Sequence, residues 1–183
     1  LASAFADHMV LQRAPATTRL WGRGIAGAPV LIRVAGTVHA NASGTVSGAG
    51  EWAAMLPPLL AGSYSLNMTS PSTGTFATLT DVLAGETFLC AGQSNMEFTV
   101  PGSFNATAEC SAAAFADLAG LRIMRVGRSQ SSSPEPELLP AAFGGSALNW
   151  SAASPQNVCP SSHSRGLGFS AACFFFEIGR AHV

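Results

Sequence analysis

The chain has 183 residues, of which 48% are hydrophobic and only 10% charged, and its formal net charge at pH 7 is −1. A chain of this length can bury the cores of one or two domains. The near-zero charge, without any basic cluster, excludes the electrostatic signature of a nucleic-acid-binding protein, and the longest apolar stretch, residues 167–176, is too short to span a bilayer.

Residues 1–80 consist of short β-prone runs separated by Gly and Pro. Two of these runs, residues 64–68 and 75–79, alternate apolar and polar side chains, as strands with one buried face do. The pattern predicts a small antiparallel β-sandwich domain over residues 1–80. Aromatic residues usually fill the core of such a domain rather than bind sugars, which we expect of Trp21, Trp52 and Tyr64. The other predicted strands are residues 30–34, 37–40 and 51–56.

After residue 80 the pattern changes to alternating strands and helices. Residues 87–91 are apolar, as expected of a parallel strand buried on both faces, and residues 121–126 form the next predicted strand. An Ala-rich helix is predicted between them, over residues 106–118, with Gly120 after its end. The remaining predicted segments are an extended loop at 131–140 and a helix that begins at 169–176. This β-α-β order predicts the opening half of a doubly wound parallel α/β domain over residues 81–176.

Four cysteines allow at most two disulfides, in three possible connectivities. We expect Cys90, in an apolar strand, and Cys173, in an apolar helix, to be free and buried. Cys110 and Cys159 have more polar neighbours and are the favoured pair. The cysteines and histidines show no metal-ligand spacing, so the sequence predicts no metal site, and nothing in it points to a cofactor.

The number of Asn-x-Ser/Thr sequons indicates the cellular location of the protein. Of the six Asn residues, four stand in Asn-x-Ser/Thr sequons, where chance gives about one; these are Asn41, Asn67, Asn105 and Asn149. The excess predicts a secreted or lysosomal glycoprotein, with a signal peptide upstream of Leu1. We expect Asn149, which precedes Trp150, to be the least accessible of the four.

The segment Cys90-Ala91-Gly92-Gln93-Ser94-Asn95-Met96 has the order of a nucleophile turn: an apolar run, a Gly that permits a sharp turn, and a Ser that begins a helix. At such a position the backbone N–H of Ser94 and the positive helix end can stabilise an oxyanion. The segment is not a Gly-x-Ser-x-Gly elbow, because Met96 stands where that motif has Gly. The alternative is that Ser94 serves only as a helix N-cap.

The block from Gly92 to Met96 resembles that of the SGNH-type carbohydrate esterases, and further landmarks resemble the sialate O-acetylesterase family. The resemblance covers roughly residues 1–176 and implies a β-sandwich followed by an SGNH-type domain. It also implies that Ser94 is the nucleophile, that its N–H lies in the oxyanion hole, and that Gln93 and Asn95 shape the site beside Gly92. The further landmarks are residues 7–13, Trp21-Gly22, Gly27, 81–86, 88–90, 121–123, 148–150 and 169–172.

The resemblance further implies an Asp-x-x-His element that supplies the base and a Gly-Gly-Thr stretch in the oxyanion hole, and neither occurs here. We therefore expect the chain to be the first portion of an enzyme, inactive alone, with its catalytic His beyond residue 183. Residues 177–183 match the translation of a common sequencing adapter and are expected to be an artefact; the alternative is a natural helix that continues from residue 176. Asp7-His8 is expected to be structural, and His163 a solvated loop residue.

Taken together, the sequence predicts a hydrolase that removes O-acetyl esters from sialic acid or related sugars. Two alternatives remain: an acetylesterase acting on xylan or another polysaccharide, and a non-catalytic glycan-binding relative. A complete set of catalytic groups distinguishes both esterases from the binding protein.

Overall fold

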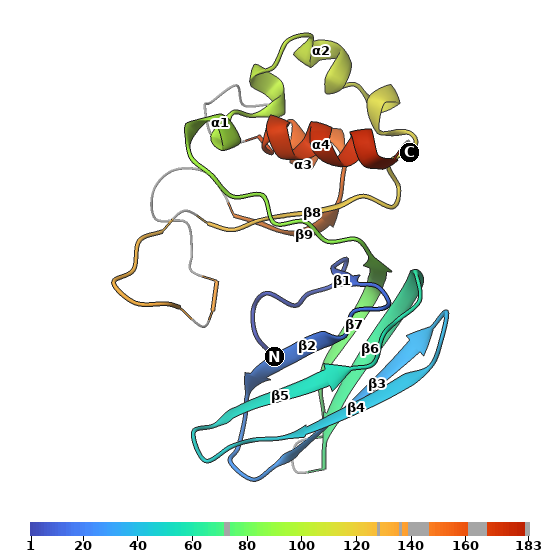
Figure 1. Ribbon diagram of the computed structural model, residues 1–183, viewed down its shortest axis with the longest axis vertical. Helices are drawn as coiled ribbons and strands as arrows, with labels where there is room; N and C mark the ends of the chain where they lie inside the picture. Colours follow the sequence, from blue (N-terminus) through green and yellow to red (C-terminus); the bar gives the residue numbers. More distant parts are fainter. Residues whose placement is uncertain (72–73, 128, 136, 139–146, 161–167, 182–183) are drawn as a thin grey trace. The chain divides into compact units, whose positions relative to one another are not determined.

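The computed structural model describes residues 1–71, 74–127, 129–135, 137–138, 147–160 and 168–181. The chain forms two compact units, Leu1–Thr87 and Phe88–Val183 (Figure 1). The first is made of strands and the second of short helices, a strand pair and one longer helix, so the expected mixed α/β class is confirmed. Strand β7 runs through residue 80 to Gly85, which carries the first unit beyond that position.

The first unit contains a five-stranded sheet and a two-stranded sheet. The order in the larger sheet is β1-β7-β6-β3-β4, and β2 pairs with β5. Every neighbouring pair is antiparallel except β1 and β7, which are parallel, so the expectation of a purely antiparallel unit is wrong at this edge. The strands are β1 Val10–Gln12, β2 Thr18–Arg23, β3 Pro29–Gly36, β4 Ala40–Thr45, β5 Glu51–Leu56, β6 Gly62–Ser70 and β7 Gly74–Gly85.

Alternating burial along the strands gives each sheet one apolar face. In β3 the side chains of Val30, Ile32 and Val34 are buried while their neighbours are exposed, and β5 shows the same period of two. Trp52 and Tyr64 are buried, as expected. Trp21 is not: it lies on the outer side of β2, between buried Leu20 and Gly22, so the alternation of the strand overrides its apolar character.

The strand predicted at residues 37–40 is wrong. The hairpin of β3 and β4 pairs Val34 with Ala40, so the residues between them are needed for the turn. Gly36 also has a left-handed φ of 151°, and a Cβ there would lie 2.1 Å from the backbone oxygen of Ser63. The β-prone side chains of residues 37–39 therefore lie in a bend.

Two sequence landmarks that lie over seventy residues apart meet where β1 pairs with β7. Asp7 Oδ1 accepts hydrogen bonds from the backbone N and Oγ1 of Thr80, at 2.6 and 3.1 Å. His8 Nδ1 lies 2.7 Å from Asp81 Oδ2, and both of these residues have left-handed φ angles. Asp7 and His8 therefore do not form a dyad with each other, because each contacts its own partner on β7.

The same pairing holds the end of the first unit. Gln12 Oε1 accepts a hydrogen bond from the backbone N of Thr87 at 3.0 Å, and Gln12 Nε2 donates to Glu86 at 2.9 Å. Arg13 Nε donates to Glu86 Oε1 at 2.6 Å. The last residues of this unit are thus fixed by polar contacts to Gln12, the last residue of β1, and to Arg13, which follows it.

The second unit lacks the predicted strand at residues 87–91. These residues form no regular element, and Leu89 is 91% exposed. An apolar run becomes a buried strand only where neighbouring strands pair with it, and none of the described strands does so. The elements are α1 Ser94–Glu97, η1 Val100–Gly102, α2 Ala106–Glu109, η2 Ala112–Phe115, β8 Arg122–Arg125, β9 Leu148–Ala152, α3 Pro155–Val158 and α4 Ala171–Ala181.

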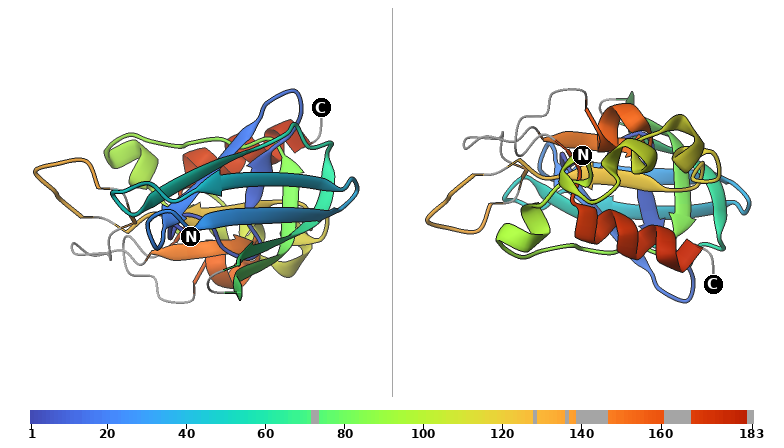
Figure 2. Two further views of the ribbon diagram at one scale, coloured as in Figure 1. Left: turned by 90° about the horizontal axis from the view of Figure 1, so that it is seen from below. Right: turned by 90° about the horizontal axis from the view of Figure 1, so that it is seen from above.

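Two further expectations for this unit are corrected. The predicted helix at 106–118 is two short helices, α2 and η2, because Ser111 has extended dihedral angles between them. Strand β8 is found at its predicted place, but it pairs with β9 in antiparallel fashion, so the described residues do not form a parallel β-α-β unit. The predicted helix near residue 169 is α4, the long red helix of Figure 2, which continues to Ala181.

Apolar side chains from most elements of the second unit form one core. Phe115 and Phe174 stack in a tilted arrangement with ring centroids 5.5 Å apart. Residues 129–135 form no helix or strand, in keeping with the predicted loop, whereas His163 lies outside the described residues. The core members are Val100, Phe115, Leu118, Ile123, Val158, Phe169, Ala171, Cys173 and Phe174.

Candidate functional site

Ser94 is the first residue of the one-turn helix α1, and its side chain is exposed. The N-cap position belongs to Gln93, which makes no side-chain capping hydrogen bond. Ser94 is therefore not the N-cap residue of α1. Gly92, Gln93 and Asn95 are exposed as well, so the middle of the predicted motif lies at the surface of this unit.

The backbone hydrogen bonds of α1 begin at the carbonyl of Gln93. The carbonyl of Gln93 accepts hydrogen bonds from Met96 N at 2.8 Å and Glu97 N at 3.1 Å. The first N–H groups of a helix, here those of Ser94 and Asn95, have no acceptor within the helix. A single turn has too few aligned peptides for a substantial macrodipole.

The lack of a side chain at Gly92 leaves room for Met96. It is not among the described glycines with a left-handed φ, so the turn does not depend on that freedom. A Cβ at residue 92 would lie 3.1 Å from the Cβ of Met96, tighter than ordinary contact. The absent side chain thus allows Met96 to fold back over the start of the motif.

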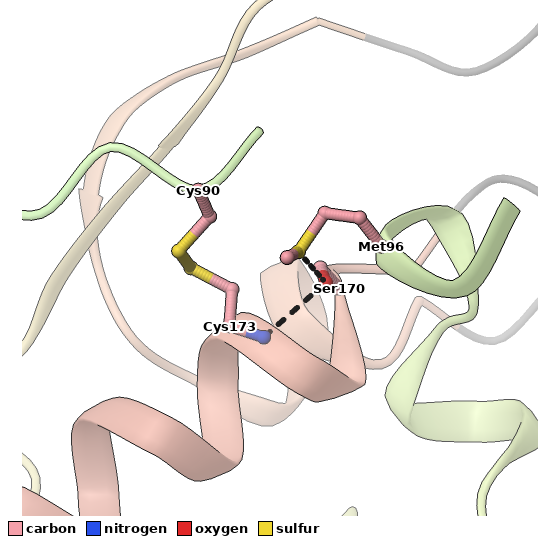
Figure 3. Close-up of a disulfide and its surroundings, with 4 residues drawn as sticks. All are labelled: Cys90, Met96, Ser170 and Cys173. Atoms are coloured by element: carbon pink, nitrogen blue, oxygen red, sulfur yellow. Dashed lines mark hydrogen bonds between the residues drawn. A yellow bond between two sulfur atoms is a disulfide. The ribbon is translucent and has the colours of Figure 1, made fainter. Parts of the chain in front are cut away.

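Both disulfides of the chain lie in this unit. Cys110 pairs with Cys159, which confirms the favoured pair. Cys90 pairs with Cys173, so the expectation that both are free is wrong (Figure 3). That expectation depended on a buried strand at residues 87–91; Cys90 instead lies in an irregular, partly exposed segment beside α4.

Backbone hydrogen bonds join the segment after α1 to the segment that begins α4. Val100 N donates to the carbonyl of Phe169 at 3.0 Å, and Ala171 N donates to the carbonyl of Phe98 at 2.8 Å. Thr99 and Ser170 form the antiparallel bridge between these two bonds. No local pattern in the sequence predicts this pairing.

Ser170 connects α4 with the motif. Its Oγ accepts a hydrogen bond from Cys173 N at 3.3 Å, the usual contact of an N-cap residue with the third helical residue. The same Oγ lies 3.3 Å from Met96 Sδ (Figure 3). A Ser followed by an apolar helical run is a recognisable N-cap signal, but its contact with Met96 is visible only in three dimensions.

Arg125 contacts Gly168, the residue that precedes Phe169. Its Nη1 donates to the carbonyl of Gly168 at 2.5 Å. Burial lowers the pKa of Arg125, yet a guanidinium keeps its charge at any ordinary pH. A Cβ on Gly168 would lie 2.7 Å from Cδ of Pro101 and 2.9 Å from Cβ of Thr99, so Gly permits the close approach of the two segments.

The sequon asparagines are accessible to different degrees. Asn41, Asn105 and Asn149 are exposed, and Asn67 is partly buried, with its Nδ2 donating to Thr78 Oγ1 at 3.2 Å. The expectation that Asn149 is the least accessible is therefore wrong. It lies on the outer side of β9, where the alternation of the strand turns its side chain away from the core.

Among the residues that the structure describes, no three His, Cys, Asp or Glu side chains gather as metal ligands would. No helix in the described ranges has both the length and the apolar character needed to cross a membrane.

Comparison with known proteins identifies relatives of the chain. No protein-family model matches the chain. Over 181 aligned residues, which cover 96% of the chain, it is 31% identical to sialate O-acetylesterase of Rattus norvegicus and 30% identical to those of Mus musculus and Homo sapiens. The chain spans about a third of the length of these curated relatives. By fold it is a disulfide-bonded mixed α/β protein. By sequence it is similar to these sialate O-acetylesterases over about a third of their length, in agreement with the resemblance of its motifs.

Proposed function

We propose that the protein is a hydrolase of the sialate O-acetylesterase type, which removes acetyl groups from sialic acid or related sugars with Ser94 as nucleophile. The observation that carries this proposal is the position of Ser94. Its side chain is exposed, it is not the N-cap of α1, and it stands at a turn beside N–H groups that have no acceptor within the helix.

In the proposed reaction, Ser94 Oγ attacks the carbonyl carbon of the acetyl ester and gives its proton to a general base. The negative charge on the carbonyl oxygen is stabilised by the backbone N–H of Ser94, with Gln93 and Asn95 shaping the site around it. The sugar oxygen leaves with a proton, and water then hydrolyses the acetyl-enzyme. We expect the base to be a His beyond residue 183, because no His of this chain stands in an Asp-x-x-His element.

The fold type of each unit and the cellular location are part of the same proposal. The first unit is proposed to be a β-sandwich, supported by one buried face on each of its two sheets. The second is proposed to be the first part of an SGNH-type domain, supported by the motif around Ser94. Two disulfides and three exposed sequon asparagines favour a secreted or lysosomal glycoprotein.

The test is hydrolysis of O-acetylated sialic acid by the full-length protein and its Ser94→Ala variant. Loss of a serine nucleophile typically lowers kcat by about 10³-fold or more, and we expect such a loss with unchanged unfolding. Ser111→Ala is the matched control, because Ser111 lies in the same unit and makes no side-chain capping bond. Equal activity of Ser94→Ala and the wild type contradicts the proposal, and a preference for acetylated xylan changes the substrate class.

A further inference from the structure

We propose that Cys90, Cys173 and Ser170 are positioning residues for Ser94, which hold its loop against the start of α4. The nucleophile loop is defined here as residues 90–100. This inference rests on the proposed role of Ser94, and it assigns to the Cys90–Cys173 disulfide an effect on catalysis beyond its effect on stability.

The loop is held covalently before Ser94. Cys90 lies four residues upstream of Ser94, and its disulfide joins it to the third residue of α4 (Figure 3). Helix α4 packs through buried Cys173 and Phe174 into the core of the unit. The entry to the nucleophile loop is therefore attached to one of the best-buried helices of this unit.

The loop is held by backbone pairing after Ser94. The carbonyl of Phe98 accepts a hydrogen bond from Ala171, and the N–H of Val100 donates to Phe169, on either side of the Thr99–Ser170 bridge. Val100 is fully buried. Both ends of the loop are thus attached to the same short segment, residues 169–173.

Between the two ends, most residues of the loop are exposed. Residues 91–95 are all exposed, whereas Met96 is partly buried and packs against the core. Ser170 Oγ contacts Met96 Sδ at 3.3 Å while it caps α4 through Cys173 N. Met96 in turn lies over Gly92, which closes a chain of contacts around the turn that carries Ser94.

This arrangement matters for catalysis because an exposed loop has many accessible conformations. A displacement of a reacting group by about 1 Å can lower the rate by about 10²-fold. Restraints before and after Ser94 restrict the conformations of the loop. We therefore expect removal of a restraint to lower kcat more than it changes KM.

The experiment compares two disulfide variants of the full-length protein, Cys90→Ala/Cys173→Ala and Cys110→Ala/Cys159→Ala. We expect the first to lower kcat at least 10-fold, with KM within about 2-fold, and the second to keep kcat near the wild-type value below its unfolding transition. Hydrogen exchange of the peptide that carries residues 90–99 should rise in the first variant only. Unchanged kcat in the first variant, or equal losses in both, overturns the proposal.

Ser170 supplies a second comparison that needs no disulfide and decides the question if the first variant does not fold. Ser170→Ala removes the hydroxyl that contacts Met96, whereas Ser170→Thr keeps a hydroxyl that can also cap α4. We expect kcat to fall about 3- to 10-fold in Ser170→Ala and to be restored in Ser170→Thr. Equal kcat in all three forms overturns the positioning role of Ser170. Failure of the proposed function is distinguishable, because Ser94→Ala would then be as active as the wild type.

Discussion

The two disulfides are nested, and this nesting predicts a particular stability pattern. Cys110 and Cys159 are 49 residues apart and lie within the 83-residue span from Cys90 to Cys173. In the chain-entropy model, closing loops of these lengths singly would stabilise by about 4.1 and about 4.5 kcal/mol. The inner bridge, however, shortens the effective outer loop to roughly 35 residues, whose closure contributes about 3.8 kcal/mol.

Removing either bridge while the other remains should therefore cost nearly the same free energy of unfolding. The expected loss is about 3.4 kcal/mol for Cys110→Ala/Cys159→Ala and about 3.8 kcal/mol for Cys90→Ala/Cys173→Ala. A loss of about 3.4 kcal/mol corresponds to roughly 300-fold faster exchange of globally protected amides.

Hydrogen exchange followed by mass spectrometry can measure this loss in each unit separately. The amides of β8 and β9 report on the second unit, and those of β3 and β6 are the internal control, because both disulfides lie in the second unit. A loss below about 1 kcal/mol in β8 and β9 would refute the nested-loop reasoning, and so would equal acceleration in both units.

Four further predictions can be checked independently. Asp7→Ala removes two hydrogen bonds from Thr80 and should lower the free energy of unfolding of the first unit by about 1–2 kcal/mol in urea titration; no change would contradict the structural role of Asp7. Phe174→Ala should cost the second unit about 3–5 kcal/mol in the same assay, because Phe174 is buried in its core, and a loss near zero would contradict that packing. Protein from a secretory host should shift in mobility after treatment with an N-glycosidase, and Asn149→Gln should reduce the shift, whereas no shift at all would remove the glycoprotein prediction. Genomic sequencing should show a different coding sequence after residue 176, and the same residues 177–183 in frame would contradict the adapter origin.

Where a local pattern matched its surroundings, the sequence predicted the structure well. The predicted strand at residues 51–56 is β5, because its alternation matches a sheet with one buried face. Strands β3, β6 and β7 and helix α4 are found at their predicted places for similar reasons. The Cys110–Cys159 pair was also predictable, from the polar neighbours of both residues.

Two failures in the second unit share one physical cause: whether a local pattern forms its usual element depends on the segments that pair with it or are bonded to it. The apolar residues 87–91 lack a neighbouring strand among the described residues and stay irregular, with Leu89 almost fully exposed. The Ala-rich segment at 106–118 is interrupted at Cys110 and Ser111, and Cys110 is bound to Cys159. Secondary-structure propensity reveals neither the missing strand partner nor the disulfide bond.

The candidate site was predictable only in part. The motif placed Ser94 at a turn that begins a helix, and the structure has that turn. The contacts that hold the loop, from Cys173 and Ser170, come from residues more than seventy positions away. Such long-range contacts leave no local pattern, so they had to come from the structure.

The most direct test of the proposed role of Ser94 is covalent labelling of the full-length protein with a fluorophosphonate, followed by peptide mass spectrometry. Such reagents react with an activated serine nucleophile and leave ordinary surface serines unmodified. We expect a single adduct on the peptide that contains Ser94, formed at a rate that parallels the loss of acetyl-ester hydrolysis. Loss of hydrolysis with the adduct on another serine, or full hydrolysis by Ser94→Ala, would contradict that role.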